Sequence, residues 1–216
     1  MKYKNIIFDF DGVLAESMHI KTQAFYKLYE PFGNNVAEQV VKHHQENGGM
    51  SRFEKLPFYH KTFLNLNINN SDIKLLSKKF SDIVVQDVIS SEEVPGANWF
   101  LEKNSNANKW VVSATPTDEI SEIIEKRNMS KFFKKVYGSP DKKVPIVKRI
   151  INENHLQIDE TIFLGDALND YEAAKKNNID FGLRKTHENK KLFLKKTGMV
   201  RFVDFYELDK ILENKT

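Results

Sequence analysis

The sequence contains no cysteine. This absence excludes disulfide bonds, a cysteine nucleophile, and any zinc or iron–sulfur site held by thiolates. Histidine is also scarce, and the six histidines show neither an HExxH motif nor another pair with typical metal-ligand spacing; they stand at positions 19, 43, 44, 60, 155 and 187. We therefore expect any metal ion to be held by oxygen ligands, and we expect most histidines to be surface or packing residues.

Long apolar runs and a strong excess of one charge are missing as well. No apolar stretch approaches the roughly 20 residues of a membrane-spanning helix, and Asp9 interrupts the N-terminal segment too early for a signal peptide. The 33 Lys and Arg exceed the 30 Asp and Glu by only three, so the basic balance of a dedicated nucleic-acid-binding protein is absent. The sequence predicts a globular, cytoplasmic protein that binds neither membranes nor nucleic acids.

Short apolar runs that end in turn residues predict five β-strands. The first covers residues 4–10 and stops at an Asp-Phe-Asp-Gly sequence. From Pro95 onward, further runs alternate with segments of helical periodicity, and this alternation indicates βαβ units and a parallel sheet. The four later runs cover residues 110–113, 136–138, 161–165 and 179–183.

Residues 16–91, between the first two strands, show only helical patterns. The first strand therefore belongs to the α/β part of the chain, although it is separated from the rest of that part by the helical segment. We infer an α/β fold with a Rossmann-like parallel-sheet core made of residues 1–15 and 92–216. An all-helical domain, residues 16–91, is inserted into this core.

Carboxylates follow two of the predicted strands, and a hydroxyl group ends a third. Asp9 and Asp11 follow the first strand, Asp166 and Asp170 follow the strand at 161–165, and Ser113 ends the strand at 110–113. Reactive groups of open α/β sheets gather beyond the carboxyl ends of the strands, so these side chains are expected to meet. One such acidic residue alone is more often a helix N-cap or a solvated loop residue, but the set forms a specific pattern.

Four neighbouring carboxylates cannot all stay ionised without a cation, because like charges raise one another's pKa. Mg²⁺ prefers oxygen ligands in octahedral geometry and keeps several waters, so carboxylates, a backbone carbonyl and a phosphate oxygen suit it. The sequence therefore predicts a Mg²⁺ site that selects phosphate esters.

At these residues the sequence resembles the haloacid dehalogenase superfamily of phosphatases and mutases, in particular its phosphoglycolate phosphatase and β-phosphoglucomutase-like group. The four motifs of the superfamily are matched in order by Asp9–Leu14 (DFDGVL), Val111–Ser113 (VVS), a lysine at 142 or 143, and Gly165–Asp170 (GDALND). The match covers the whole chain in layout. The helical segment also falls where helical cap domains are inserted in this superfamily.

The resemblance implies a role for each acidic residue. Asp9 would be the nucleophile that forms an aspartyl-phosphate, and Asp11 would be the acid/base that protonates the leaving oxygen and later activates water. Asp166 would join Asp9 and the Asp11 backbone carbonyl around Mg²⁺, with Asp170 as a further metal ligand or as a support for the ligands. True dehalogenases lack an acid/base at the position of Asp11, so phosphoryl transfer is favoured.

Two further groups would stabilise the transferred phosphoryl group. The Ser113 hydroxyl would donate to a phosphoryl oxygen, helped by backbone N–H groups of the adjacent loop at Ala114, and a lysine would offset charge and hold the nucleophile's carboxylate. Lys142 has the Lys-x-x-Pro spacing to Pro145 that is common in relatives, whereas Lys143 stands closer to the following helical run. We assign this role to Lys143.

The loop at residues 48–52 (GGMSR) resembles a Gly-x-Ser-Arg segment in the caps of β-phosphoglucomutase-like proteins. There the arginine grips a distal anionic group of the substrate, so Arg52 is a candidate for that contact. Lys21, at the entrance of the helical segment, is a candidate for another anion contact. The alternatives are a Gly-rich turn in which Ser51 caps a helix and Arg52 is solvated, and a plain surface role for Lys21.

We expect a Mg²⁺-dependent phosphatase that hydrolyses a small phosphorylated metabolite, a sugar phosphate or a phosphoglycolate-like acid, and acts as a monomer or homodimer. A β-phosphoglucomutase-like phosphomutase is the nearest alternative, although such relatives carry a histidine where this chain has Lys21. A receiver-like signalling module with a phosphorylated aspartate is a third interpretation. It explains neither the helical insertion nor the pair Asp9 and Asp11.

Overall fold

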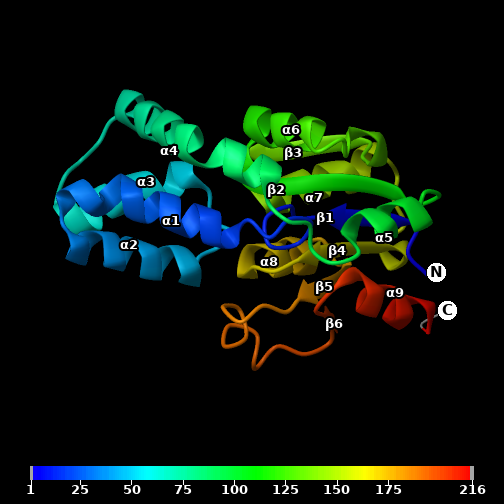
Figure 1. Ribbon diagram of the computed structural model, residues 1–216. Coiled ribbons are helices and arrows are strands. Elements are labelled where there is room, and N and C mark those ends of the chain that lie inside the picture. The colour runs from blue at the N-terminus through cyan, green and yellow to red at the C-terminus, as the bar shows by residue number, and fades with distance from the viewer. Residues whose placement is uncertain (1, 215–216) are drawn as a thin grey trace.

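Six parallel strands form one sheet at the centre of the larger part of the protein (Figure 1). The computed structural model describes residues 2–214. The strands are β1 (Asn5–Phe8), β2 (Asn108–Pro116), β3 (Lys135–Ser139), β4 (Thr161–Gly165), β5 (Asp180–Arg184) and β6 (Val200–Phe202), in the spatial order β3-β2-β1-β4-β5-β6. The predicted α/β class with a parallel sheet is confirmed, and β1 lies in the interior of the sheet.

Both faces of the sheet are buried under helices. Alternate side chains of β1 belong to different apolar layers: Ile6 and Phe8 lie in one, and Ile7 lies in the other. Helices α5 (Ala97–Lys103), α6 (Thr117–Lys126) and α9 (Phe205–Glu213) supply the first layer, and α7 (Lys143–Glu153) and α8 (Leu168–Lys176) supply the second. Burial on both faces explains why the strands are short continuous apolar runs in the sequence.

Two of these elements, β6 and α5, were not predicted from the sequence. Strand β6 is three residues long and has Arg201 at its centre, so it lacks an apolar run. Helix α5 is only seven residues long, which is too short to show a clear period. Strand β2 is also longer than the predicted run at 110–113, and its register against β3 shifts between Val112 and Pro116.

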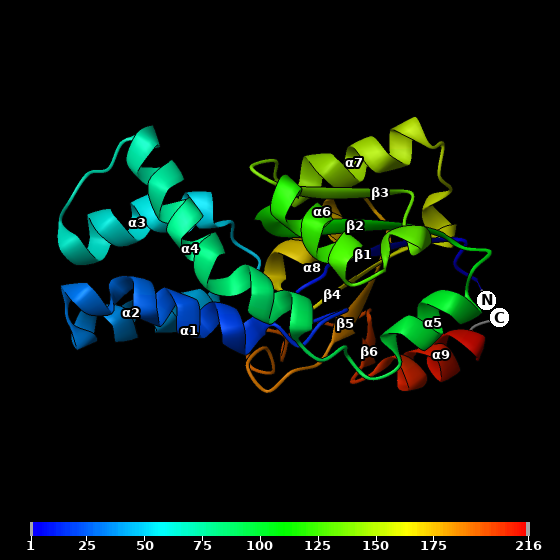
Figure 2. The same ribbon diagram turned by 45° about the horizontal axis from the view of Figure 1, so that its top comes forward.

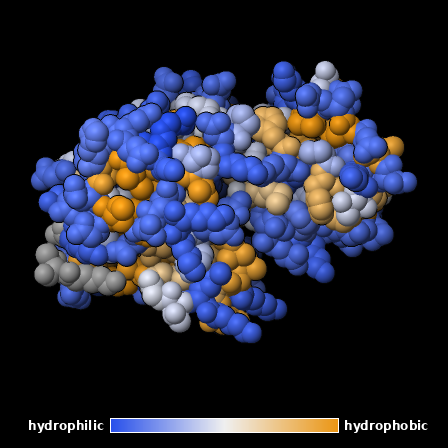
Figure 3. Space-filling model, turned by 180° about the vertical axis from the view of Figure 1, so that it is seen from behind, coloured by the Kyte–Doolittle hydropathy of each residue, from blue (hydrophilic) through white to orange (hydrophobic). Residues whose placement is uncertain are grey.

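Four helices follow β1 in the sequence and lie together beyond one end of the sheet (Figure 2). We call them the helical block: α1 (Met18–Tyr29), α2 (Asn34–Glu46), α3 (Arg52–Leu64) and α4 (Asn70–Ser90). Aromatic side chains pack in its interior, with the Phe25 ring 4.4 Å from the Phe80 ring and 5.7 Å from the Tyr59 ring. The surface seen from behind shows a larger and a smaller lobe, both mainly hydrophilic (Figure 3).

The two chain segments that join the block to the sheet are paired with each other. Ala15, in the first segment, forms an antiparallel bridge with Glu93, in the second. The Glu16 N–H donates to the Glu92 carbonyl at 2.9 Å, and the Val94 N–H donates to the Leu14 carbonyl at 3.1 Å. The block therefore leaves and re-enters the core at one place.

Further contacts fasten the block to the core. The Arg127 guanidinium donates to the carbonyls of Val88, Ile89 and Ser91 at 2.8 to 2.9 Å, which satisfies the C-terminal end of α4. The Asn169 amide donates to the Gly49 carbonyl at 3.0 Å. Within residues 2–214, no helix combines the length and the apolar character that crossing a membrane requires.

Candidate active site

Polar side chains converge where β1, β2 and β4 reach their carboxyl ends. From β1 the chain builds β2 and β3 on one side, and it then returns to place β4 on the other side of β1. Such a reversal leaves a crevice beyond the ends of the central strands. Asp9 directly follows β1, Asp166 directly follows β4, and Ser113 lies in the last part of β2.

Three of the four predicted carboxylates form one buried group. An oxygen of each of Asp9, Asp166 and Asp170 lies within 4.8 Å of the others. Burial raises the pKa of Asp9 to about 7, and the charges of Asp170 and Asp11 add to this effect, although Lys143 opposes it. Burial and the Asp9 charge also raise the pKa of Asp166 well above its ordinary value. The protein thus gathers negative charge that its own cations only partly offset.

The ammonium group of Lys143 lies between two of these carboxylates. It is 2.7 Å from Asp9 Oδ2 and 2.6 Å from Asp170 Oδ1. Burial disfavours the charged amine, but the charges of Asp170 and Asp9 prevail and raise the pKa of Lys143. Lys142, by contrast, is exposed and lies 3.1 Å from Glu54. The structure therefore brings Lys143, and not Lys142, to the carboxylates.

Both carboxylate oxygens of Asp170 are engaged by the protein. Oδ1 binds Lys143, and Oδ2 accepts from the N–H groups of Asp166 and Ala167 at 3.2 and 3.0 Å. Asp170 thus orients both Lys143 and the loop that carries Asp166. The close approach also requires a glycine at position 165, because a Cβ there would lie 2.4 Å from the Asp170 Cβ.

Asp11 occupies a separate environment from the other three carboxylates. Its Oδ1 accepts from Ser17 Oγ at 2.6 Å, and its Oδ2 accepts from Thr115 Oγ1 at 3.0 Å, from Ser113 Oγ at 3.4 Å and from the Lys21 ammonium group. Burial favours the neutral acid, but the Lys21 charge and these hydrogen bonds prevail and lower the pKa of Asp11. The Asp11 carboxylate therefore lies outside the group formed by the other three.

Lys21 is buried rather than free on the surface, and its second partner is Thr115 Oγ1 at 2.7 Å. Neither Thr115 nor Ser17 was singled out from the sequence. Thr115 could have been found, because it lies two residues after Ser113 and side chains two apart on a strand share a face.

Arg52 is held by the core of the protein. Its guanidinium forms a two-pronged ion pair with Glu119 of α6, at 2.9 and 2.6 Å, and also donates to Ser81 Oγ at 2.8 Å. Ser51 caps α3 by accepting from the Phe53 N–H, as expected for the Gly-rich turn. Arg52 itself is buried, not solvated, and its best hydrogen-bonding edge is already occupied.

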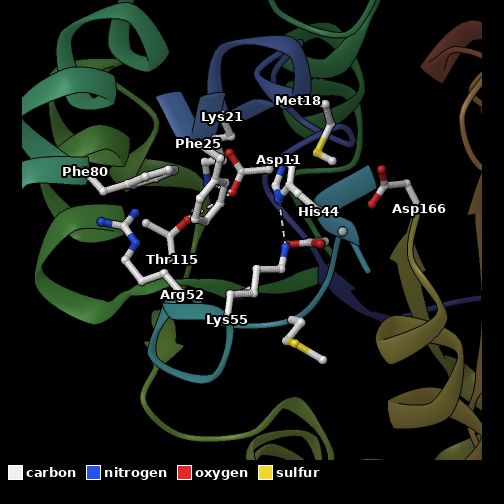
Figure 4. Close-up of a pocket in the computed structure, with 14 residues that line it drawn as sticks. Asp11, Met18, Lys21, Phe25, His44, Arg52, Lys55, Phe80, Thr115 and Asp166 are labelled. Atoms are coloured by element: carbon white, nitrogen blue, oxygen red, sulfur yellow. Dashed lines mark hydrogen bonds and ion pairs between the residues drawn. The ribbon is translucent and has the colours of Figure 1, made fainter. Parts of the chain in front are cut away.

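A pocket lies between the helical block and the carboxylates (Figure 4). The core contributes Asp9, Asp11, Ala114, Thr115 and Asp166, and the charged or aromatic residues of the block are Lys21, Phe25, His44, Arg52, Lys55 and Phe80. Lys55 and His44 were not identified from the sequence. Ser113 and Ala114, the residues predicted to bind the phosphoryl group, line a second, adjoining pocket together with Lys142 and Lys143.

Comparisons with known proteins identify the family and the fold. Residues 6–183 match the family described as haloacid dehalogenase-like hydrolases. A proposed phosphoglycolate phosphatase from Lactobacillus plantarum has a TM-score of 0.74 and 20% identity, over 99% of both chains. A proposed phosphoglycolate phosphatase from Haemophilus somnus has a TM-score of 0.74 and 18% identity, over 98% of this chain and 99% of that one.

A proposed β-phosphoglucomutase from Bacteroides vulgatus has a TM-score of 0.75 and 17% identity, over 98% of this chain and 88% of that one. At such low identities these three structures establish a shared fold. No curated protein matches the chain.

Proposed function

The chain belongs to the haloacid dehalogenase-like hydrolase family, and from this premise we propose that it is a Mg²⁺-dependent phosphatase of small phosphorylated metabolites. The observation that carries the proposal is the contrast between Asp9 and Asp11. Asp9 lies in a cluster of three buried carboxylates, and a bound cation would stabilise their ionised forms. Asp11, by contrast, is held ionised by Lys21 and three hydroxyl groups. Two carboxylates in different environments can take different catalytic roles.

The buried carboxylates fit a magnesium ion. Asp9 and Asp166 would supply ligand oxygens, because burial without a cation disfavours their ionised forms. Asp170 would position Lys143 and the loop that carries Asp166 rather than bind the ion, since Lys143 and two backbone N–H groups already occupy its oxygens. The bound ion would offset the charge of these carboxylates and of the phosphoryl oxygens.

The reaction would proceed in two displacements at phosphorus. An Asp9 oxygen forms a bond to phosphorus while the bond to the leaving oxygen breaks, and Asp11 gives a proton to that oxygen. Lys21 holds Asp11 ionised in the free protein, so the proton that Asp11 gives to the leaving oxygen would first pass to it from the substrate. A phosphate monoester has a second pKa of about 6, so a fraction of its molecules still carry that proton at neutral pH. Water then attacks the aspartyl-phosphate, Asp11 accepts its proton, and inorganic phosphate leaves.

Three groups would hold the transferred phosphoryl group. Lys143 neutralises part of the charge at Asp9 and fixes its carboxylate. The Ser113 hydroxyl and the backbone N–H of Ala114 would donate to phosphoryl oxygens. Ser113 lies in the last part of β2, where its Oγ accepts from the Thr115 N–H at 3.1 Å and donates to Asp11 Oδ2 at 3.4 Å. In the substrate complex, this long hydrogen bond to Asp11 would be exchanged for one to a phosphoryl oxygen.

The helical block, within residues 16–91, would act as a cap over a catalytic core of residues 1–15 and 92–216. It supplies one wall of the pocket, and the core supplies the other. A closed cap excludes water during attack by Asp9 and restricts the substrate to small molecules. The distal anion contact expected of Arg52 would require its guanidinium to leave, or to share its charge with, Glu119.

Release of inorganic phosphate from a panel of small phosphate monoesters tests the proposal. We expect release with Mg²⁺ and none with EDTA. The panel includes sugar phosphates, and the remaining ester is checked for rearrangement, because a mutase returns the phosphoryl group to the sugar. If the folded protein released no phosphate from any ester, the phosphatase proposal would be wrong, and an isomerised sugar phosphate would favour the mutase.

A further inference from the structure

Lys55 is a buried amine that has no acidic partner. It lies on α3, is 1% exposed and lines the pocket. Within residues 2–214, its Nζ lies 2.8 Å from His44 Nδ1 and 5.6 Å from the centre of the Phe25 ring, and it pairs with no carboxylate. The other two cations that the block places in the pocket are both paired, Lys21 with Asp11 and Arg52 with Glu119.

His44, on α2, adds an unsatisfied donor beside this amine. Burial, together with the Lys55 and Lys21 charges, lowers the pKa of His44 well below its ordinary value, so the ring is neutral. When Lys55 donates to Nδ1, the single ring proton lies on Nε2. Within the described residues, Nε2 is buried and has no hydrogen-bond partner. Figure 4 shows the ring between Lys55 and Asp11, inside the pocket.

A buried ammonium group without a carboxylate partner and a buried N–H without an acceptor both reduce the stability of the folded protein. Here they lie next to each other in a pocket that also contains the proposed nucleophile. Together they offer one positive charge and N–H groups from two side chains. A carboxylate matches this set, since it has one negative charge and two acceptor oxygens, whereas a phosphate carries nearly two charges at neutral pH.

We propose that Lys55 and His44 form a subsite for a carboxylate carried by the substrate at the end opposite to its phosphate. This inference rests on the proposed function and narrows its substrate class to short phosphorylated hydroxy acids. It also assigns the distal anion contact to residues other than Arg52, whose guanidinium is occupied by Glu119. Phosphorylated sugars without an acid group would lack a partner for Lys55.

The charges around Lys55 suit an anion that arrives with the substrate. Burial lowers the pKa of Lys55 to about 7, the nearby cations Lys21 and Arg52 lower it further, and Asp11 opposes them. His44 and His43, both on α2, face the same group, and the pKa of each is lowered. A bound carboxylate would restore the charge on Lys55, so binding of the acid should weaken as the pH rises above 7.

Calorimetric binding of two phosphonates, in the presence of Mg²⁺, tests the subsite without requiring turnover. The first, 3-phosphonopropionate, has the atoms of a short phosphorylated acid with a carbon in place of the bridging oxygen. The second, 3-hydroxypropylphosphonate, carries a hydroxyl group in place of the carboxylate. We expect Lys55→Met to weaken binding of the first roughly 10- to 100-fold, as for loss of a charge-assisted hydrogen bond, and to change binding of the second less than about twofold.

Two further variants complete the test. Lys61→Met removes an exposed lysine from the same helix and should leave both affinities unchanged. His44→Asn keeps an acceptor near Lys55 but removes the Nε2 donor, and it should weaken binding of the acid roughly 3- to 10-fold. Equal losses for both phosphonates with Lys55→Met, or no loss, would overturn the subsite while binding of the second phosphonate still supports a phosphate site.

A third ligand, ethylene-1,2-diphosphonate, separates a carboxylate subsite from a second phosphate subsite. Tighter binding of this ligand than of 3-phosphonopropionate, lost in Lys55→Met, would overturn the choice of a carboxylate. If the wild-type protein bound none of the three ligands but released phosphate from the ester panel, the subsite would be wrong and the phosphatase proposal would stand. Release of phosphate from no ester would refute the phosphatase proposal itself.

Discussion

Replacing Lys55 by methionine should stabilise the folded protein at neutral pH. Methionine keeps an unbranched side chain of similar length, so it can fill the space between Phe25 and His44, but it carries no charge into the interior. Lys55 is 1% exposed and has no acidic partner in the described part of the chain. Its folded state therefore disfavours the protonated amine that the unfolded chain holds at neutral pH.

The size of the effect follows from the two pKa values of Lys55. Its pKa is 10.5 in the unfolded chain and about 7 in the folded protein. Between these values the unfolded state binds more protons, so the stability of the wild type rises with pH in this window and is lowest below pH 7. One pKa unit corresponds to about 1.4 kcal/mol. The lowered pKa of Lys55 therefore reduces the unfolding free energy by about 4 kcal/mol at pH 7, about 2 kcal/mol at pH 9 and less than about 1 kcal/mol at pH 10.

Urea unfolding of the wild type and of Lys55→Met, followed between pH 6 and pH 10, measures this cost. The gain in unfolding free energy of the variant should be largest at pH 6 to 7 and should shrink toward pH 10. Lys61→Met, on the exposed side of the same helix, should differ little from the wild type at every pH. A gain that does not change with pH, or a less stable variant at pH 7, would refute the reasoning.

Three other predictions concern the carboxylates. Asp9→Asn should abolish phosphate release and leave the fold intact, because it removes the nucleophile and one of three crowded acids; the exposed control Asp159→Asn should stay active, and an active Asp9→Asn would refute the assignment. Mg²⁺ at 100 times its Kd should add roughly 3 kcal/mol to the unfolding free energy, reversed by EDTA, and thermal unfolding without any shift would contradict a metal site. Glu119→Gln should lower the unfolding free energy by about 3 to 5 kcal/mol, because Arg52 would lose its buried partner; urea unfolding equal to wild type would show that the pair contributes little.

Much of the fold could be predicted because the sheet is buried on both faces. Burial forces strands such as β4 to be continuous apolar runs, and a run of that kind is visible in the sequence. The acidic residues were identifiable for a related reason: parallel strands place their carboxyl ends at one edge, so residues that follow different strands must meet. The order of the strands then brings Asp9 next to Asp166.

The block's contribution to the pocket could not be predicted in the same way. His44 and Lys55 meet because α2 and α3 pack together, and helix packing depends on side-chain shapes that periodicity does not report. The Arg52 partner, Glu119, lies 67 residues away and in the other part of the protein. A sequence motif indicated that Arg52 is special, but only the tertiary structure shows which group its charge meets.

The paired segments that join the helical block to the sheet restrict how the block can move. Because Ala15 and Glu93 are bridged, the two connecting segments are held side by side. Any rotation of the helical block relative to the sheet would take place about this pair of segments. Asp11 lies beside this axis and would stay in place, whereas Lys21 would travel with α1. Rotation of the block away from the sheet would separate the Lys21 ammonium group from the Asp11 carboxylate. The pKa of Asp11 would therefore be higher with the block rotated away than with the block in its present position.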